Sequence, residues 1–155
     1  MSDIRLSYVD VYVLRGIGDA LEALVLCRGA AGRCPGAWES VHGGIESGEA
    51  PVAAALRELR EETGLVPERF YNLSRVEAFY RHREDFVALI PVFVALVAPG
   101  APVRLSDEHE AFEWLTPAAA GARMAWPRER RALEDAVALL SGGDAGPVED
   151  VLRVW

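Results

Sequence analysis

The order of apolar runs along the chain restricts its fold more than any other sequence feature. Five runs are rich in β-forming residues: 8–14, 21–27, 71–82, 85–97 and 112–115. One helical stretch lies between the second and third of these runs, and another follows the last. Strands and helices in this order favour a layered sheet covered by helices. No repeat or long linker divides the 155 residues, so the sequence predicts a single domain, residues 1–155, of α/β (α+β) class.

Both predicted helices carry an apolar stripe along one side. Apolar residues recur every three or four positions through residues 51–63 and again through residues 127–140, which is the helical period. Pro51 suits the first turn of a helix, and Gly64 suits the position just after its end. The boundaries of the first helix are therefore predicted at residues 51 and 63.

The remaining segments are predicted from their glycine and proline content. Residues 29–35 and 38–48 contain glycines without a regular apolar period, so we expect loops there. Pro91 interrupts the long apolar run 85–97, and a proline within a strand predicts a bulge or an edge position. This run suits either a central strand or part of a dimer surface, so both a monomer and a homodimer remain open.

Charge and cysteine content exclude several classes of partner. The chain has 24 acidic and 16 basic residues, the basic ones are all arginine, and the net charge is −8. Such an acidic chain would be repelled by a nucleic acid polymer. Residues 1–10 lack the apolar core of a secretory signal, and no apolar stretch is long enough to cross a membrane. Cys27 and Cys34 are the only cysteines, which is typical of a reduced cytoplasmic protein.

Three glutamates gather on the first predicted helix. Glu58, Glu61 and Glu62 are spaced at i, i+3 and i+4, so they share one face. Like charges at this spacing destabilise a helix by about 0.2–0.5 kcal/mol per pair. A solvated acidic face is the commoner explanation of such spacing alone. The alternative is a site for Mg²⁺ or Mn²⁺, which prefer oxygen ligands.

A longer pattern around these glutamates favours the metal site. Residues 43–65 match every fixed position of the Nudix box, and the chain therefore resembles the Nudix hydrolase family. The nine matching positions are Gly43, Glu49, Arg57, Glu58, Leu59, Glu61, Glu62, Gly64 and Leu65. This resemblance implies an αβα sandwich with a mixed central sheet. It also implies hydrolysis of a nucleoside diphosphate linked to another group, with Mg²⁺ or Mn²⁺ as cofactor.

The resemblance assigns roles to individual residues of the box. It makes Glu58, Glu61 and Glu62 metal ligands, and one of these glutamates removes the proton from the attacking water. Arg57 would orient the glutamates through its planar fork of donors, and Glu49 would support the metal site. Gly43 and Gly64 would serve loop geometry.

The residue before the box departs from the common Gly-Gly pattern. His42 stands there, and its backbone carbonyl can still serve as a metal ligand because that role does not need glycine. Its imidazole would alternatively contact a phosphate of the substrate.

Segments outside the box resemble the bacterial dihydroneopterin triphosphate pyrophosphatase branch of the family. These segments are residues 38–41 (WESV), 107–115 (DEHEAFEWL) and 118–140. By this similarity Glu108 becomes a further metal ligand or the base, with Glu110 as the fallback. Arg81 and Arg83 would hold the phosphate tail, although a charged hairpin tip explains them as well. The order Trp-Pro-Arg-Glu at residues 126–129 departs from that branch.

Two tryptophans in these segments have different expected places. Trp114 is expected in the core, and Trp126 remains open between the core and a pocket wall.

These features together predict a magnesium-dependent pyrophosphohydrolase. Its expected substrate is a small nucleoside or pterin triphosphate, such as a (d)NTP or dihydroneopterin triphosphate. The alternative within the same chemistry is ADP-ribose, a nucleotide sugar or a dinucleoside polyphosphate. A non-catalytic module that senses a nucleotide is a further alternative, but such a module would be expected to have lost carboxylates of the box.

Overall fold

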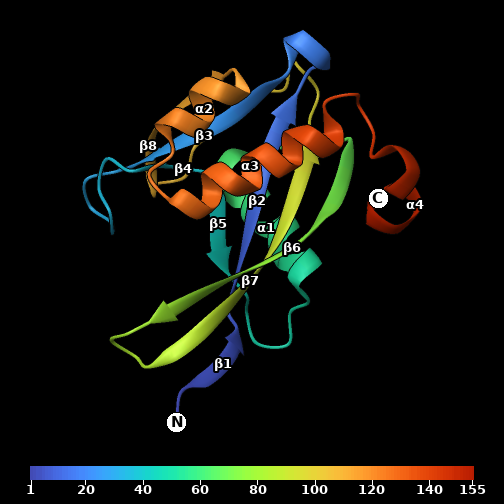
Figure 1. Cartoon of the computed structure of the whole chain (residues 1–155). Coiled ribbons are helices and arrows are strands. Elements are labelled where there is room, and N and C mark those ends of the chain that lie inside the picture. Colours follow the sequence, from blue (N-terminus) through green and yellow to red (C-terminus); the bar gives the residue numbers. More distant parts are fainter.

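The computed structural model describes residues 1–155, which form one mixed sheet with helices on both faces (Figure 1). The strands are β1 (Asp3–Leu6), β2 (Tyr8–Arg15), β3 (Glu22–Arg28), β4 (Trp38–Glu39), β5 (Val41–Gly44), β6 (Arg69–Arg81), β7 (Phe86–Leu96) and β8 (His109–Leu115). The helices are α1 (Pro51–Thr63), α2 (Pro117–Arg123), α3 (Pro127–Leu140) and α4 (Glu149–Leu152), with short 3₁₀ turns η1 (Gly18–Ala20) and η2 (Gly146–Val148).

Strand β7 lies at the centre of the sheet. Its neighbour on one side is β6, which runs antiparallel to it. On its other side β1 and then β2 pair with it in parallel. Strand β2 also pairs antiparallel with β5 and β3, and β3 continues to β4 and β8. The prediction of a mixed central sheet is therefore confirmed.

The two faces of the sheet have separate apolar cores because alternate residues of a strand point to opposite faces. Val9 and Val11 of β2 pack with Leu59 of α1 on one face. Tyr12 of β2 packs with Leu133 of α3 on the other. In Figure 1, α3 crosses in front of the sheet and α1 lies behind it. The predicted αβα sandwich is confirmed.

The ends of α1 lie where the sequence predicts them. Pro51 occupies the first turn, and Gly64 adopts a left-handed conformation (φ 71°) whose N–H donates to the carbonyl of Arg60. No helix of the structure combines the length and apolar character needed to cross a bilayer.

The prediction of a loop over residues 38–48 is partly wrong. Residues 38–39 form β4 and residues 41–44 form β5, which pairs with residues 8–11 of β2. Glycines weaken local strand propensity, but pairing with a buried neighbour overrides it. Strand β1, helix α2 and the C-terminal turn and helix also have no counterpart in the sequence prediction.

Pro91 lies in the central strand rather than at an edge, and its surroundings explain why it is tolerated. On one side of β7 the neighbour changes from β1, which ends opposite Leu89, to β2, whose pairing with β7 begins at Val92. On the other side Pro91 faces Val76 beside a register shift of β6. The proline thus occupies a place where the ladder needs no donor on the β1–β2 side. The bulge beside it lies in β6, not in the run 85–97 where the sequence predicts one.

Candidate functional site

Arg57 organises the acidic face of α1. Its guanidinium donates two hydrogen bonds of 2.8 Å to Glu49, one of 2.8 Å to Glu58 and one of 3.2 Å to Glu61. A further bond of 2.8 Å reaches the carbonyl of Gly44 in β5. The bonds from Arg57 hold the pKa of Glu49 down to about 2. One rigid fork therefore fixes three carboxylates relative to β5.

Gly43 lets β5 approach this face. A Cβ atom on Gly43 would lie 2.0 Å from the Cδ of Glu58, a distance that no side chain tolerates. Gly44, the next residue, has open space around its Cα atom. The structure thus gives Gly43 a steric role, which is to admit the carboxylate of Glu58 against the strand.

A carboxylate cluster lies at the centre of the site, formed by Glu62 of α1 with Glu108 and His109 at the start of β8. One ligand atom from each of these residues lies within 4.8 Å of the other two. Glu62 is 2% exposed, its Oε2 accepts a 3.3 Å bond from the backbone N–H of His42, and its Oε1 has no partner.

Glu62 and Glu108 have no arginine partner, unlike Glu58 and Glu61, which Arg57 contacts. Burial, and then the neighbouring carboxyl of Glu108, raise the pKa of Glu62 to about 10. Burial also raises the pKa of Glu58 despite its bond to Arg57. A buried carboxyl such as Glu62, held this close to the exposed carboxylate of Glu108, ionises readily only when a positive charge joins the pair. The donor set therefore fits a divalent cation, held by Glu62 and Glu108 with Glu58 and Glu61 nearby.

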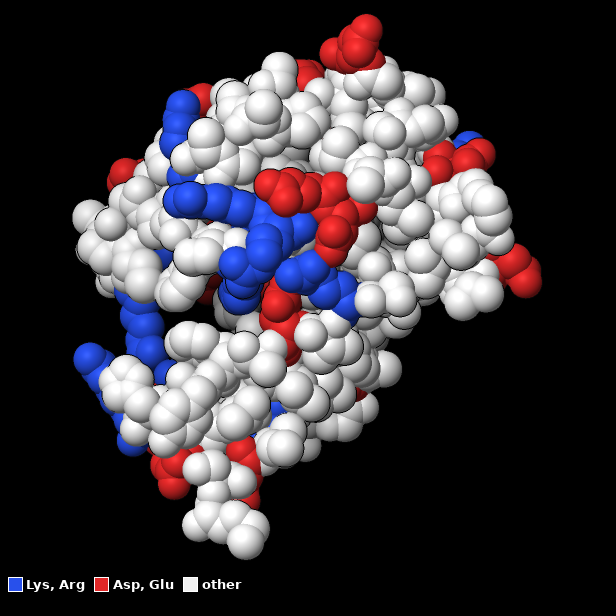
Figure 2. Space-filling model, viewed as in Figure 1, with Lys and Arg blue, Asp and Glu red and all other residues white.

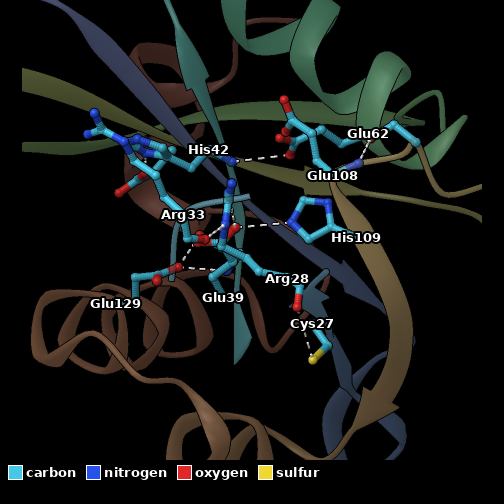
Figure 3. Close-up of polar contacts among 12 residues, drawn as sticks. Cys27, Arg28, Arg33, Glu39, His42, Glu62, Glu108, His109 and Glu129 are labelled. Carbon is cyan, nitrogen blue, oxygen red and sulfur yellow. Dashed lines mark hydrogen bonds and ion pairs between the residues drawn. The ribbon is translucent and has the colours of Figure 1, made fainter. Parts of the chain in front are cut away.

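His109 connects this cluster to a second one. Its side chain is fully buried, and its Nε2 lies 3.0 Å from Oε1 of Glu39. The same oxygen of Glu39 accepts a 3.0 Å bond from Arg28. Burial alone would raise the pKa of Glu39, but the bonds from His109 and Arg28 outweigh it and lower the pKa. Figure 3 shows the ring of His109 between Glu39 and the Glu62–Glu108 pair.

A cleft of about 460 Å³ lies beside the carboxylate cluster. Its walls come from the β6–β7 hairpin, the loop after β3 and the start of α3. The basic residues that line it are Arg28, Arg33, His42, Arg81, His82, Arg83 and Arg128. The space-filling view in Figure 2 shows arginines gathered around a hollow, although the whole chain is acidic. The cleft therefore suits a ligand with several negative charges.

Aromatic side chains form the rest of the wall. Phe79 and Trp126 meet edge to face with ring centroids 6.4 Å apart, and Tyr8 stacks on His42 at 5.1 Å. The question left open for Trp126 is thus answered, since it lines the cleft. Such walls suit a planar ring.

A group of charged residues that we call the cleft floor consists of Asp10, His42, Arg128 and Glu129. Asp10 and Glu129 are buried, whereas His42 and Arg128 line the cleft. Asp10 is fully buried, with Oδ1 at 2.7 Å from Nδ1 of His42 and Oδ2 at 3.3 Å from Arg128. Burial lowers the pKa of His42, but Asp10 outweighs burial and raises it. Glu129 accepts hydrogen bonds from the backbone and hydroxyl of Ser40.

The structure distributes the expected site residues between these places. Glu62 and Glu108 meet in the carboxylate cluster, Glu58 is held beside it, and Glu61 is 57% exposed at the outer end of Arg57. His42 reaches both places, because its side chain lines the cleft and its backbone bonds Glu62. Arg81 and Arg83 line the cleft.

Two other expected residues lie outside the site. Glu110, the fallback for Glu108, points toward the thiol of Cys27 at 4.0 Å and takes no part in the cluster. Trp114 packs partly exposed against the core, with Arg15 4.2 Å above its ring.

Sequence reasoning missed Asp10, Glu39, His109 and Glu129. The signal for Asp10 was a lone carboxylate within the apolar run 8–14, since an unpaired charge is seldom buried.

Comparison with known proteins agrees with this geometry. The Nudix domain family matches residues 5–136. Octanoyltransferase of Myxococcus xanthus is 38% identical over 114 residues, which is 69% of this chain but only 30% of that protein. The chain therefore spans less than a third of the length of that relative. The nucleoside triphosphatase NudI of Escherichia coli is 30% identical over 104 residues, 61% of this chain and 74% of NudI.

A solved structure extends the likeness to the fold. The E. coli dihydroneopterin triphosphate pyrophosphohydrolase matches with a TM-score of 0.66 and 25% identity, over 89% of this chain and 99% of that one. The family match covers most of the chain and includes the whole segment 43–65. The chain belongs to the Nudix hydrolase family.

Proposed function

We propose that this protein is a pyrophosphohydrolase that uses Mg²⁺ or Mn²⁺ to cleave the phosphate chain of a nucleoside or pterin triphosphate. The observation that carries the proposal is the position of a charge-rich carboxylate cluster next to an arginine-lined cleft. A cluster that requires cations and a cleft that requires anions are complementary halves of a site for a metal-complexed polyphosphate.

The cleft supplies the contacts for the substrate. Arg28 and Arg33 lie on the side nearest Glu39, and Arg81 and Arg83 lie on the hairpin, so arginines face the phosphate chain from two sides. Since the chain has no lysine, arginine provides every permanent cation available for phosphate. Phe79 and Trp126 would hold the planar ring of the substrate.

The residues of α1 and β8 supply the chemistry. A divalent cation held by Glu62 and Glu108, together with Glu58 and Glu61, would neutralise charge that develops on the phosphate oxygens. Water would attack a phosphorus atom, the bridging P–O bond would break with release of pyrophosphate, and a carboxylate among Glu58, Glu61 and Glu108 would accept the proton of the water. Arg57 orients Glu58 and Glu61 for these roles.

Two of the compared proteins support a triphosphate substrate. NudI is a nucleoside triphosphatase, and the E. coli structural neighbour acts on dihydroneopterin triphosphate. We further propose that residues 1–155 act as a single domain and work in the cytoplasm. Cys27 and Cys34 are both unpaired, as in proteins of a reducing compartment.

A product-resolved substrate screen tests the proposal. The panel contains (d)NTPs, dihydroneopterin triphosphate, ADP-ribose, a nucleotide sugar and a dinucleoside polyphosphate, each with Mg²⁺ and with Mn²⁺. We expect pyrophosphate and a monophosphate from at least one triphosphate. Hydrolysis of ADP-ribose or a nucleotide sugar to two phosphorylated products, without turnover of triphosphates, would replace the proposed substrate. If the protein binds nucleotides but hydrolyses none of the panel, it is a sensing module.

A further inference from the structure

His109 has a ring nitrogen with no hydrogen-bond partner in a fully buried place. Its Nε2 lies 3.0 Å from Glu39, while its Nδ1 has no partner. A buried polar atom without a partner is unfavourable, and native proteins seldom retain one without a use. His109 belongs with Glu62 and Glu108 to the group in which one ligand atom of each residue lies within 4.8 Å of the others.

The bond to Glu39 determines what this nitrogen can do. An ionised carboxylate only accepts hydrogen bonds, so Nε2 of His109 carries the proton that it donates to Glu39. In the neutral ring Nδ1 then presents its lone pair to the carboxylates (Figure 3). No oxygen of Glu62 or Glu108 makes a hydrogen bond with this nitrogen. A carboxylate that orients a histidine in this way is the usual outer support of a metal ligand.

We propose that Nδ1 of His109 binds the divalent cation directly, together with Glu62 and Glu108. The site then has mixed nitrogen and oxygen ligands. Mg²⁺ selects oxygen ligands, whereas an imidazole ligand suits transition metals, so the chain should bind Mn²⁺ in preference to Mg²⁺. This inference rests on the metal dependence in the proposed function and adds a ligand that the carboxylates of the box do not include.

The position of Glu39 links this ligand to the substrate. Glu39 lines the cleft, and one of its oxygens bonds both His109 and Arg28. Arg28 also lines the cleft. Arg28 and the proposed metal ligand His109 therefore share the carboxylate of Glu39. The geometry places Glu39 as a positioning residue between the two halves of the site.

Pulsed electron paramagnetic resonance of Mn²⁺ bound to the full chain tests the inference. A directly bound imidazole produces nitrogen modulation of the electron spin echo. We expect this modulation in the wild type and its loss in His109→Gln, whose amide can still bond Glu39. Titration calorimetry should show Mn²⁺ affinity lowered about 10–100-fold in His109→Gln, with Mg²⁺ affinity lowered much less.

Glu110→Gln is the matched control, because it removes a charge from the same strand without touching the cluster. It should retain the nitrogen modulation and keep the Mn²⁺ affinity within about threefold, as expected for an exposed charge. If His109→Gln fails to fold, the double variant His42→Gln/His82→Gln leaves His109 as the sole histidine. Modulation that persists there supports the inference, and modulation that disappears overturns it.

The outcomes separate this inference from the proposed function. Mn²⁺ that binds with oxygen ligands only, and with no preference over Mg²⁺, would overturn the role of His109 and leave the hydrolase proposal intact. Failure of the wild-type protein to bind either cation would overturn both.

Discussion

The carboxylate cluster and the cleft floor each contain buried acidic side chains, but they differ in how the charge is balanced. In the cleft floor, Asp10 lies between two basic side chains, His42 and Arg128. In the carboxylate cluster, Glu62 and Glu108 have no arginine within ion-pair distance, and the pKa of Glu62 rises to about 10. The cleft floor supplies its own countercharge, and the carboxylate cluster needs one from outside.

This difference separates a scaffold from a binding site. Buried charges that neutralise one another hold elements together and resist the loss of either partner. Charges of one sign held close together are unfavourable until a ligand of the opposite charge binds, so such a group favours binding of that ligand. Substitutions of Asp10 and Glu129, which are buried and do not line the cleft, should therefore mainly lower stability, and substitutions in the carboxylate cluster should mainly lower activity.

The largest effect is expected for Glu62→Gln. Activity with Mg²⁺ or Mn²⁺ should fall about 10³-fold, because the variant loses a ligand of the cation that would stabilise charge developing on the phosphate oxygens. The stability of the metal-free protein at pH 7 should stay unchanged or increase. The reason is that the raised pKa already keeps this carboxyl neutral without a cation, and glutamine resembles that neutral form. Steady-state kinetics and thermal unfolding in a chelator measure the two effects.

The control for this prediction is Glu110→Gln, whose side chain lies outside the cluster. If Glu62→Gln kept full activity, or if it destabilised the metal-free protein strongly, the claim that the carboxylate cluster serves activity rather than stability would be wrong.

Asp10→Asn should lower the stability of the fold strongly and change metal binding little. Removing one member of a buried charge group leaves its partners unpaired and costs roughly 3–5 kcal/mol of unfolding free energy. His42 and Arg128 would both lose their countercharge, while Mn²⁺ affinity should stay within about threefold because Asp10 lies outside the carboxylate cluster. Urea unfolding and metal titration measure these quantities.

Asp3→Asn is the matched control, since Asp3 forms a surface ion pair with Arg5 in which both side chains are more than half exposed. Such a pair contributes at most about 1 kcal/mol. An equal loss in both variants would show that burial of the cleft floor has no special importance.

The two clusters also differ in how far the sequence predicts them. The glutamates of α1 lie within a few residues of one another on one helix, so local spacing already places them on one face. Pro51 and Gly64 fix the ends of that helix by local backbone preferences. The box and the helix that carries it could therefore be predicted from neighbouring residues.

The cleft floor could not be predicted in this way. Asp10, Ser40 and Glu129 come from β2, the segment before β5 and α3, and they meet only when α3 packs on the sheet. Strand β5 could not be predicted for the same reason. Its glycines form a strand only when they pair with β2. His109 was visible in the sequence, but its unpartnered nitrogen depends on Glu39, which lies 70 residues earlier.

A smaller loss of activity is expected for Gly43→Ala. The added methyl group would lie 2.0 Å from the Cδ of Glu58, so the carboxylate or β5 must move. A displacement of about 1 Å in a catalytic group can cost about 10²-fold in rate. Gly44→Ala is the control, because its Cβ would meet no atom within 4 Å. Equal kinetics for the two variants would remove the steric role of Gly43 and show that Glu58 tolerates movement.

The smallest effect concerns the pH dependence of the cleft floor. Burial, and then the charge of Asp10, raise the pKa of Glu129 to about 7. Because the folded-state pKa lies above the unfolded value near 4.5, this group stabilises the fold most below pH 4.5 and loses that contribution as pH rises through 7.

Within that window the unfolding free energy should fall by up to about 1.4 kcal/mol per pH unit from this residue. Glu129→Gln should flatten the slope between pH 5.5 and 6.5, as measured by urea unfolding at fixed ionic strength. The same variant should leave the Mn²⁺ affinity of the carboxylate cluster unchanged, since Glu129 has no contact with it. If the pH dependence of the unfolding free energy did not change, Glu129 would already be ionised in this range. The charges of Asp10, His42 and Arg128 would then balance the charge of Glu129.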